Sequence, residues 1–220
     1  MTTPRSTTRS AMLDRIRAAV AAGSPAVAPG PVPRAYQRAG TNAPGSEQVL
    51  DLLVDRLLDY KAEVTVVGST AELPAAVDVA LGWARSVVVP AGLPEPARAG
   101  SAAGGRTVVV DSDPAVLTPV ELDRIDAVVT GATVAIAVTG TIILSGRGDE
   151  GRRAISLVPD LLVVIVRLEQ IVETVPDGLR RLTPTAPLTM ISGPSATSDI
   201  ELSRVEGVHG PRTLRVLITR

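Results

Sequence analysis

Short runs of valine recur through the middle of the chain, separated by segments with the residue spacing of helices. Four of these runs are Glu63 to Gly68, Ser86 to Pro90, Thr107 to Asp111 and Asp126 to Thr130. Apolar residues at consecutive positions of a strand require both of its faces to be buried. Strands of this kind belong to a parallel sheet that helices cover on both faces. The runs therefore predict an α/β fold with a mostly parallel central sheet flanked by helices.

The second half of the chain departs from this alternation. Two apolar runs, Val134 to Val138 and Thr141 to Ser145, are separated only by Thr139 and Gly140. Such a short connection predicts a hairpin or a tight bend inside the sheet. Further strands are expected at residues 161–166, 188–191 and 213–219, and helices at residues 46–58, 72–84, 119–125 and 172–182.

The first 45 residues form a region of their own. Residues 10–22 carry apolar side chains at helical spacing, and residues 23–44 are rich in glycine, proline and alanine. Residues 1–45 are therefore predicted to be an N-terminal helix with a Gly/Pro-rich linker, and residues 46–220 the α/β domain. The helix is either an arm that packs on the domain or on another subunit of a homo-oligomer, or a loosely attached terminus.

Composition excludes several classes of protein. The chain has no cysteine and a single histidine, His209. This excludes disulfides, thiol catalysis and cysteine-ligated zinc or iron-sulfur clusters within the chain, and it argues against a self-contained metal site. The 22 basic and 23 acidic residues nearly cancel, and Trp83, Tyr36 and Tyr60 are the only aromatic residues. Neither the basic surface nor the stacking residues of a nucleic-acid-binding protein are present.

The sequence also argues against export and membrane insertion. Charged residues interrupt the apolar positions near the N-terminus before the core of a signal peptide can form. Residues 127–146 carry no charge, and their number is close to the roughly 20 residues of a membrane span. Threonine and glycine interrupt this segment, however, and its valine and isoleucine favour two buried strands. We therefore expect a soluble, cytoplasmic protein with no membrane span.

Polar loops after the predicted strands hold the first candidate ligand-binding residues, because ligands of such folds bind beyond the carboxyl ends of the strands. One loop contains Thr139, Gly140 and Thr141, where a glycine between hydroxyls lets a backbone amide approach a phosphate or carboxylate. An ordinary turn is the alternative. A second loop presents Arg152 and Arg153 after a glycine-rich, lid-like segment, and planar guanidinium groups suit a carboxylate or phosphate. The alternative is a solvated loop with two surface arginines.

A third loop, from Ser192 to Arg212, combines turn-forming residues with many polar groups. We expect Asp199, Glu206 and His209 to be catalytic, with His209 as a general base near neutral pH. The structural alternatives are a helix cap made by residues 198 and 201, and a histidine that only ties the loop down. The ligand-binding candidates in this loop are Ser192, Gly193, Ser195, Thr197, Ser198, Glu201, Gly207, Gly210 and Arg212.

Three motifs resemble the lactate utilization protein C family, whose members carry the LUD domain. They run from Gly131 to Ile142, from Gly151 to Asp160 and from Ser192 to Arg212, and the resemblance extends from about Ser46 to the C-terminus. It implies a fold similar to that of coenzyme A transferases and ribose-5-phosphate isomerase. It also implies oxidation of L-lactate to pyruvate together with iron-sulfur partner proteins. In that system this cysteine-free chain is the substrate-handling or accessory subunit and is not active alone.

The resemblance also bears on the ligand and on the alternatives. Val138 stands where members of the family carry a glutamate, which excludes a glutamate nucleophile at this position. The expected ligand is a small anion, namely lactate, pyruvate or a phosphorylated compound, and iron-sulfur clusters are expected only in the partners. Two other functions stay open on the sequence. They are a stand-alone isomerase or acyl-transferase-like enzyme, and a non-enzymatic scaffold or regulator of the iron-sulfur proteins.

Overall fold

A computed structural model of the chain describes residues 8–23, 30–197, 205–206 and 210–220. The chain divides into two compact units, Met1–Tyr36 and Gln37–Arg220. The first unit contains helix α1 (Thr8–Ala22), whose apolar side chains Met12 and Ile16 are exposed. The second unit contains the sheets and the candidate site.

The larger unit starts before the end of the predicted linker. The amide of Gly40 donates a hydrogen bond of 2.9 Å to Oδ2 of Asp177, and the amide of Asn42 donates one of 2.7 Å to Oε2 of Glu173. These bonds hold residues 40–42 against the last helix of the unit and the segment that leads into it. The compact unit therefore begins at Gln37, whereas the sequence places the start of the domain at residue 46.

The larger unit alternates helices and strands over most of its length. Within the described residues, no helix is both long and apolar enough to cross a membrane. In chain order the elements are α2 (Glu47–Asp59), β1 (Glu63–Val67), α3 (Leu73–Leu81), β2 (Ser86–Pro90), α4 (Glu95–Ala102), β3 (Thr107–Asp111), α5 (Pro119–Leu122), β4 (Ala127–Thr130), β5 (Val134–Ile136), β6 (Thr141–Leu144), β7 (Leu161–Arg167), β8 (Ile171–Val172), α6 (Val175–Leu179), β9 (Thr189–Ile191), β10 (Ala196–Thr197), β11 (Val205–Glu206) and β12 (Thr213–Thr219).

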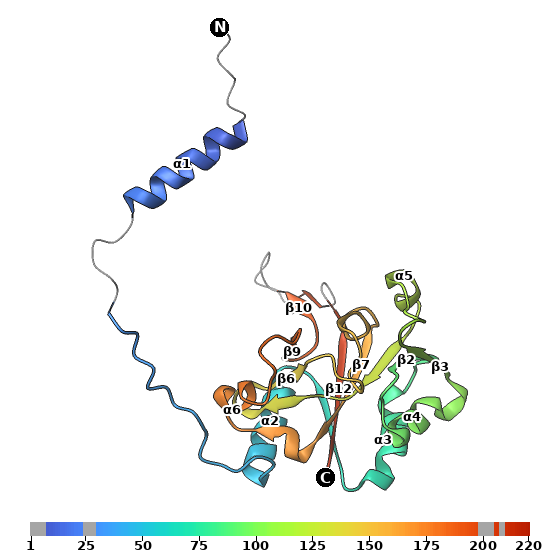
Figure 1. Cartoon of the computed structure of the whole chain (residues 1–220). Coiled ribbons are helices and arrows are strands. Elements are labelled where there is room, and N and C mark those ends of the chain that lie inside the picture. Colours follow the sequence, from blue (N-terminus) through green and yellow to red (C-terminus); the bar gives the residue numbers. More distant parts are fainter. Residues whose placement is uncertain (1–7, 24–29, 198–204, 207–209) are drawn as a thin grey trace. The chain divides into compact units, whose positions relative to one another are not determined.

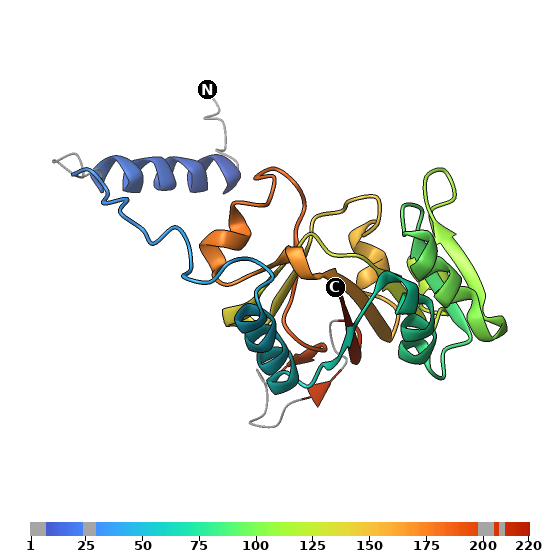
Figure 2. The ribbon, with the colours of Figure 1, turned by 90° about the horizontal axis from the view of Figure 1, so that it is seen from below.

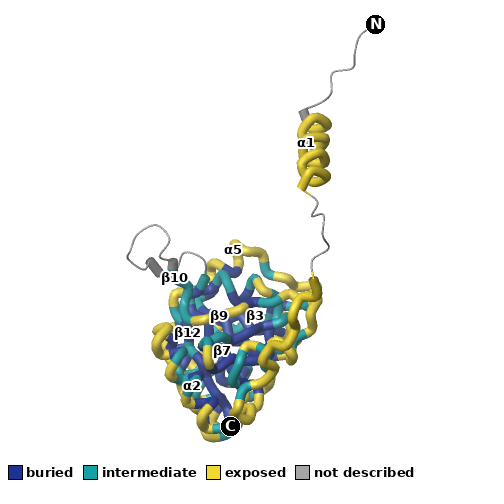
Figure 3. Tube along the Cα trace, turned by 90° about the vertical axis from the view of Figure 1, so that its left-hand side faces the viewer, coloured by how far each residue is buried: buried dark blue, intermediate teal, exposed yellow. Residues whose placement is uncertain are grey.

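The central sheet has six strands in the order β1-β12-β7-β4-β2-β3, and every neighbouring pair is parallel. This confirms the predicted α/β fold with a parallel central sheet. Strand β7 lies inside the sheet, and all of its residues except the last, Arg167, are buried. Figure 3 shows this strand in the buried interior. Its continuous apolar sequence is thus explained by burial on both faces.

Helices cover both faces of this sheet. On one face, α2 packs through Leu53 and Leu57 in a core that it shares with the second sheet. On the other face, Val77 and Leu81 of α3 pack with residues of α4 in a separate core. Figures 1 and 2 show α2 on one side of the sheet and α3 with α4 on the other. Each fully buried aliphatic side chain contributes about 1.5–3 kcal/mol through the hydrophobic effect, so both layers are firmly held.

The predicted hairpin is confirmed, but it does not lie in the central sheet. Strands β5 and β6 are antiparallel, with Val134 opposite Ile143, and they form the middle of a four-stranded sheet in the order β8-β5-β6-β9. The chain leaves the parallel sheet after β4, and the hairpin then pairs with β8 and β9. The expectation of a hairpin inside one mixed sheet was therefore wrong, because pairing partners distant in sequence decide which sheet a hairpin joins.

Two helices also differ from the expectation. The predicted helix at residues 172–182 is reduced to α6, because Ile171 and Val172 form strand β8. Helix α4 was not predicted, since its sequence is short and contains Gly100. A Cβ atom at Gly100 would lie 2.4 Å from the carbonyl oxygen of Pro74. Glycine is therefore what allows α4 to pack this closely on α3.

The strand order places a topological switch between β2 and β4. From β2 the chain continues to β3 at one edge of the sheet, whereas from β4 it continues through the second sheet to β7 on the other side. Connections that leave in opposite directions open a crevice beyond the carboxyl ends of such strands, where ligands of doubly wound sheets bind. A ligand-binding site is therefore expected at the loops after β2, β3 and β4.

Candidate functional site

A cavity of about 490 Å³ lies beyond the carboxyl ends of β2 and β3. A neighbouring cavity of about 180 Å³ shares Ser156 and Thr189 with it. We call the two cavities together the groove. Its lining residues are Ala91, Asp111, Ser112, Asp113, Val116, Leu144, Gly146, Arg147, Gly148, Gly151, Arg152, Arg153, Ser156, Leu157, Leu162, Pro187, Thr189, Met190, Ile191, Ser192, Gly193, Pro194, Ser195, Gly210, Pro211 and Leu214.

Residues 146–151, named here the glycine loop, form one wall of the groove. Glu150 is only 1% exposed and holds this loop in place. Its carboxylate accepts hydrogen bonds from the amides of Ser145 (2.6 Å) and Arg147 (3.1 Å), and from the hydroxyl of Thr133. A buried carboxylate needs such donors, since an unpaired one is strongly destabilising. The sequence suggested a lid, whereas the loop is pinned to the body by this side chain.

Backbone contacts join the glycine loop to the ends of β2 and β4. The amide of Gly92 donates to the carbonyl of Gly148, and the amide of Gly131 donates to the carbonyl of Asp149, both at 2.9 Å. A Cβ atom at Gly92 would lie 2.5 Å from the carbonyl carbon of Gly148, so glycine is needed where these two loops meet. The loop is thus attached at the switch point of the sheet.

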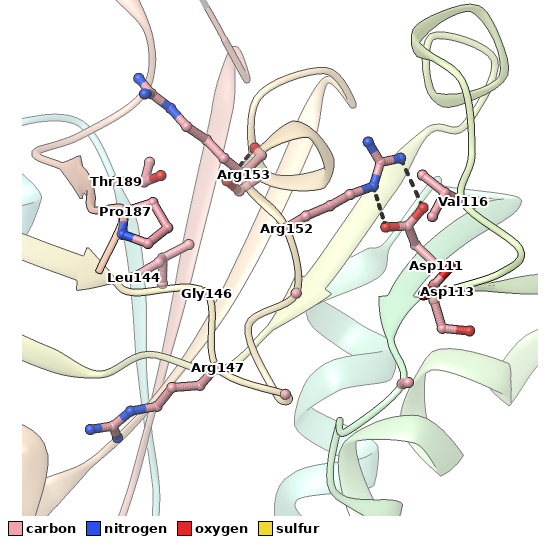
Figure 4. Close-up of a pocket in the computed structure, with 15 residues that line it drawn as sticks. Asp111, Asp113, Val116, Leu144, Gly146, Arg147, Arg152, Arg153, Pro187 and Thr189 are labelled. Atoms are coloured by element: carbon pink, nitrogen blue, oxygen red, sulfur yellow. Dashed lines mark hydrogen bonds and ion pairs between the residues drawn. The ribbon is translucent and has the colours of Figure 1, made fainter. Parts of the chain in front are cut away.

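Arg152 points to Asp111, the last residue of β3 (Figure 4). Its Nε lies 2.6 Å from Oδ2 of Asp111 and its Nη2 lies 2.9 Å from Oδ1, so the pair is bidentate. Arg152 also donates to the carbonyl of Leu117. The Asp111 side chain is 2% exposed and that of Arg152 is 34% exposed. Most of the donor capacity of Arg152 is therefore used within the protein.

These contacts change the acidity of both groups. Burial raises the pKa of Asp111, whereas the hydrogen bonds from Arg152 and from the Leu117 amide, together with the charge of Arg152, lower this pKa by more than burial raises it. The net pKa of Asp111 therefore lies below its ordinary value. The hydrogen bond to Asp111 correspondingly raises the pKa of Arg152. The pair is therefore ionised, and it fixes the loop after β3 to the wall of the groove.

Arg153 points in the opposite direction from Arg152, although the two residues are consecutive (Figure 4). It is exposed, lines the groove, and has no ion-pair or hydrogen-bond partner for its guanidinium group in the part of the chain that the structure describes. The groove is lined by three arginines and two aspartates, which leaves a formal excess of one positive charge. Arg147 also lines the groove without a partner for its guanidinium group among the described residues. Arg147 and Arg153 are thus the two arginines of the groove that are available to an anion.

The loop of Thr139, Gly140 and Thr141 lies beside the groove and does not line it. Gly140 has φ 58° and packs against Arg56 of α2, where a Cβ atom would come within 2.9 Å of the Arg56 Cβ. The hydroxyl of Thr141 lies 2.9 Å from that of Ser192. The structure therefore brings the first and third predicted loops together through one hydroxyl pair. The role of the three residues in ligand binding stays a prediction.

The third loop falls partly within the described residues. Ser192, Gly193, Ser195 and Gly210 line the smaller cavity of the groove. Arg212 lies outside the groove, directly before the amino end of β12. Its Nη1 is 3.4 Å from Oδ1 of Asp160, which directly precedes β7. The backbones of residues 197 and 206 belong to the two-stranded sheet β10-β11. The predicted sites Ser198, Asp199, Glu201, Gly207 and His209 lie outside the described residues, as do the side chains of Thr197 and Glu206.

Sequence reasoning missed Asp111, Asp113 and Glu150. Asp111 ends a valine-rich strand and is followed by Ser112 and Asp113, so the rule that places ligands beyond carboxyl ends of strands could have found these residues. Glu150 gave no such signal, because its burial and its hydrogen bond from Thr133 arise only in the folded chain. Within the described residues, no group of three histidine, aspartate or glutamate side chains is placed to share a metal ion.

Comparisons with known proteins agree with this fold. The LUD domain model matches residues 118–219. Lactate utilization protein C of Deinococcus radiodurans is 50% identical over 212 residues, which cover 94% of this chain and 93% of the relative. Lactate utilization protein C of Shouchella clausii is 34% identical over 39% of this chain and 40% of its own length.

A solved structure has a similar fold. The crystal structure of a DUF162 family protein from Deinococcus radiodurans superposes with a TM-score of 0.66 at 45% sequence identity, and covers 79% of this chain and 97% of that protein. Together with the similarity over almost the full length of the first relative, this leaves one conclusion. The chain belongs to the lactate utilization protein C family of LUD-domain proteins.

Proposed function

We propose that this chain is a component of a lactate utilisation system that oxidises L-lactate to pyruvate. The observation that carries the proposal is the 50% identity to lactate utilization protein C over 94% of the chain. Similarity of this extent covers the sheet, the second sheet and the loops that line the groove, and so includes the parts on which a shared function depends.

The chain requires partners for the redox step. Oxidation of lactate to pyruvate removes a pair of electrons and a pair of protons, and the electrons need an acceptor. The sequence has no cysteine, so it cannot supply the thiolate ligands of an iron-sulfur cluster. We therefore place the clusters in partner proteins and assign this chain the substrate-handling or accessory role.

The groove is the proposed ligand site within this role. Arg153 offers a guanidinium group without a partner in the described residues, and the hydroxyls of Ser156 and Ser192 line the same space. A carboxylate or phosphate suits an arginine, since both accept two parallel hydrogen bonds. The Asp111–Arg152 pair holds the opposite wall in position. His209, Glu206 and Asp199 remain the proposed catalytic residues from the third loop.

Deletion of the gene tests the proposal. The deletion strain should fail to grow on L-lactate as sole carbon source and should grow normally on pyruvate, and the wild-type gene should restore growth. The variant Arg153→Gln should restore growth only partly, whereas Arg85→Gln, an exposed arginine outside the groove, should restore it fully. Normal growth of the deletion strain on lactate would contradict the proposal.

A second experiment tests the division of labour. The tagged chain, isolated without oxygen from cells grown on lactate, should carry with it proteins that contain iron and acid-labile sulfide. The chain purified alone should contain neither and should not oxidise lactate. Lactate oxidation by the isolated chain would show that the electron acceptor is not in a partner.

A further inference from the structure

Helix α3 lacks the polar outer face of an ordinary surface helix. Its buried side packs in the core through Val77 and Leu81. Its other side carries Ala75 and Val79, and Val79 is 78% exposed. Asp78 is the only charged residue of this helix, and it is held in an ion pair. Apolar residues on both sides are typical of a helix that is covered on both sides.

The uncovered side of α3 borders an unpaired edge of the central sheet. Strand β1 ends the strand order, and β12 is its only neighbouring strand in the part of the chain that the structure describes. A cavity of about 590 Å³, named here the edge cavity, is lined by Val66 of β1 and by Ala76 and Val79 of α3. Val66 is 43% exposed. An edge strand with exposed apolar residues pairs readily with a strand of another chain.

Two unpaired charges of opposite sign lie at the two ends of β1. Lys61, the only lysine of the chain, is exposed and lies two residues before the strand. Beyond the other end, the Glu72 carboxylate accepts a hydrogen bond of 2.9 Å from the hydroxyl of Ser69. Neither Lys61 nor Glu72 has an ion-pair partner among the described residues. The charge of Glu63, by contrast, is balanced by Arg215, which donates hydrogen bonds of 2.9 and 3.2 Å to it.

A second copy of the chain fits this edge. Closed dimers have two-fold symmetry, and a two-fold axis perpendicular to the sheet makes the β1 strands of two copies antiparallel. Only the register centred on Thr65 pairs all five residues of β1, and opposite side chains then point to the same face of the sheet. In this register Val64 of each copy lies opposite Val66 of the other.

The same register is complementary in charge. Lys61 of each copy lies opposite Ser69 of the other, next to the Glu72 carboxylate that this serine binds. The two-fold axis makes this contact twice. It also places the two α3 helices on the same face of the joined sheet, with the exposed Val79 of each bordering the edge cavity. One arrangement therefore covers the unpaired charges and the apolar side of α3.

We propose that two copies of the chain pair antiparallel through β1 and form a homodimer. This pairing joins the two six-stranded sheets into one continuous sheet. Cross-strand pairs of valines and of opposite charges stabilise such a contact. The small side chain of Ala75 lets the two α3 helices approach, and Val79 of each packs in the contact. The interface lies outside the groove, and the proposal does not depend on the ligand.

Sedimentation velocity of the purified full chain tests the dimer. At tens of micromolar the measured mass should be twice the 22.7 kDa of the chain. Val79→Glu places two like charges between the α3 helices and should weaken dimerisation at least about a hundredfold. The matched control Val120→Glu changes a 64% exposed valine of α5 and should leave the dimer intact. Both side chains are exposed in the single chain, so the far-UV circular dichroism of both variants should match that of wild type.

Charge reversal and cross-linking test the register. Lys61→Glu and Glu72→Lys should each weaken dimerisation about tenfold, because each contact occurs twice, and the double variant should restore it. A carbodiimide, which joins an amine directly to a carboxylate, should link Lys61 of one copy to Glu72 of the other. The same link cannot form within one chain, since the five residues of β1 separate its two ends by about 16 Å.

Three results would overturn the proposal. A chain that is monomeric at tens of micromolar does not pair with itself, and loss of co-purified proteins in Val79→Glu would then assign this edge to a different partner. A dimer that Val79→Glu leaves intact has its interface elsewhere. Single charge reversals that the double variant does not rescue would show that Lys61 and Glu72 do not meet across the axis.

Discussion

The ion pair between Asp111 and Arg152 gives the most direct test of how the groove is held together. In the variant Asp111→Asn one bidentate, charge-assisted contact is replaced by a single neutral acceptor. Breaking a fully buried pair costs about 3–5 kcal/mol, and losing an exposed pair costs about 0–1 kcal/mol. Here one partner is 2% exposed and the other 34% exposed, so the loss is discounted for solvent around Arg152. We expect a decrease of about 2 kcal/mol in the free energy of unfolding.

Thermal unfolding measures this loss. A change of 1 kcal/mol shifts Tm by about 2–4 °C for a protein of this size, so Asp111→Asn should melt about 4–8 °C below wild type at neutral pH. The matched control is Asp55→Asn, whose pair with Arg56 is solvated, with side chains 64% and 43% exposed. That variant should differ from wild type by less than ~0.5 kcal/mol. Equal melting of Asp111→Asn and wild type would refute the argument.

The pH dependence checks the sign. The pKa of Asp111 is lower in the folded protein than its ordinary value, so the pair stabilises the fold fully above the unfolded pKa of about 3.9. This contribution is lost as the pH falls through the folded pKa. The difference between wild type and Asp111→Asn should therefore be constant from neutral pH down to mildly acidic pH and should shrink below it. A difference that grows on acidification would contradict the assignment of the pair.

Three glycine and acid positions give further predictions. Glu150→Gln should lower the free energy of unfolding in urea by about 1–3 kcal/mol, because the 1% exposed side chain accepts hydrogen bonds from two amides and a hydroxyl. An unchanged free energy of unfolding would mean that these hydrogen bonds do not stabilise the fold. Gly140→Ala should cost about 1–3 kcal/mol, and more than Gly105→Ala, since both have positive φ but only Gly140 faces a neighbour within 2.9 Å; equal losses would remove the contact from the explanation. Gly100→Ala should cost about 1–3 kcal/mol through its 2.4 Å approach to Pro74, whereas Gly30→Ala, with no atom within 4 Å, should be neutral in the same denaturation assay.

The fold was predictable where local sequence decides it. The run from Ser86 to Pro90 can be identified as a buried strand from its own sequence, because all of its residues are apolar or small. The order of the strands was not predictable, because β12, the last strand, inserts between β1 and β7. The hairpin of β5 and β6 illustrates the same limit. Its turn is local, but its membership in a second sheet depends on β8 and β9.

The candidate site shows a sharper limit. The sequence indicates that Arg152 and Arg153 suit an anion, but it treats them alike. Asp111, distant in sequence, pairs with Arg152 and leaves Arg153 facing the groove. Charge neutralisation of this kind is a property of the folded chain, since it depends on which acid a loop brings within about 3 Å. The sequence therefore identifies residues that can bind an anion, but only the fold decides which of them are already paired with an acidic side chain.

Glu150 links the glycine loop to the proposed ligand site. Arg147 and Gly148 line the groove, and Glu150 is buried beside them. Its carboxylate accepts from the amides of Ser145 and Arg147, so its replacement releases the backbone that forms this wall of the groove. Glu150→Gln should therefore slow growth on lactate, although Glu150 itself does not line the groove. If Glu150→Gln destabilises the protein but leaves growth on lactate unchanged, the position of the loop does not matter to the ligand site and the loop is only a surface connection.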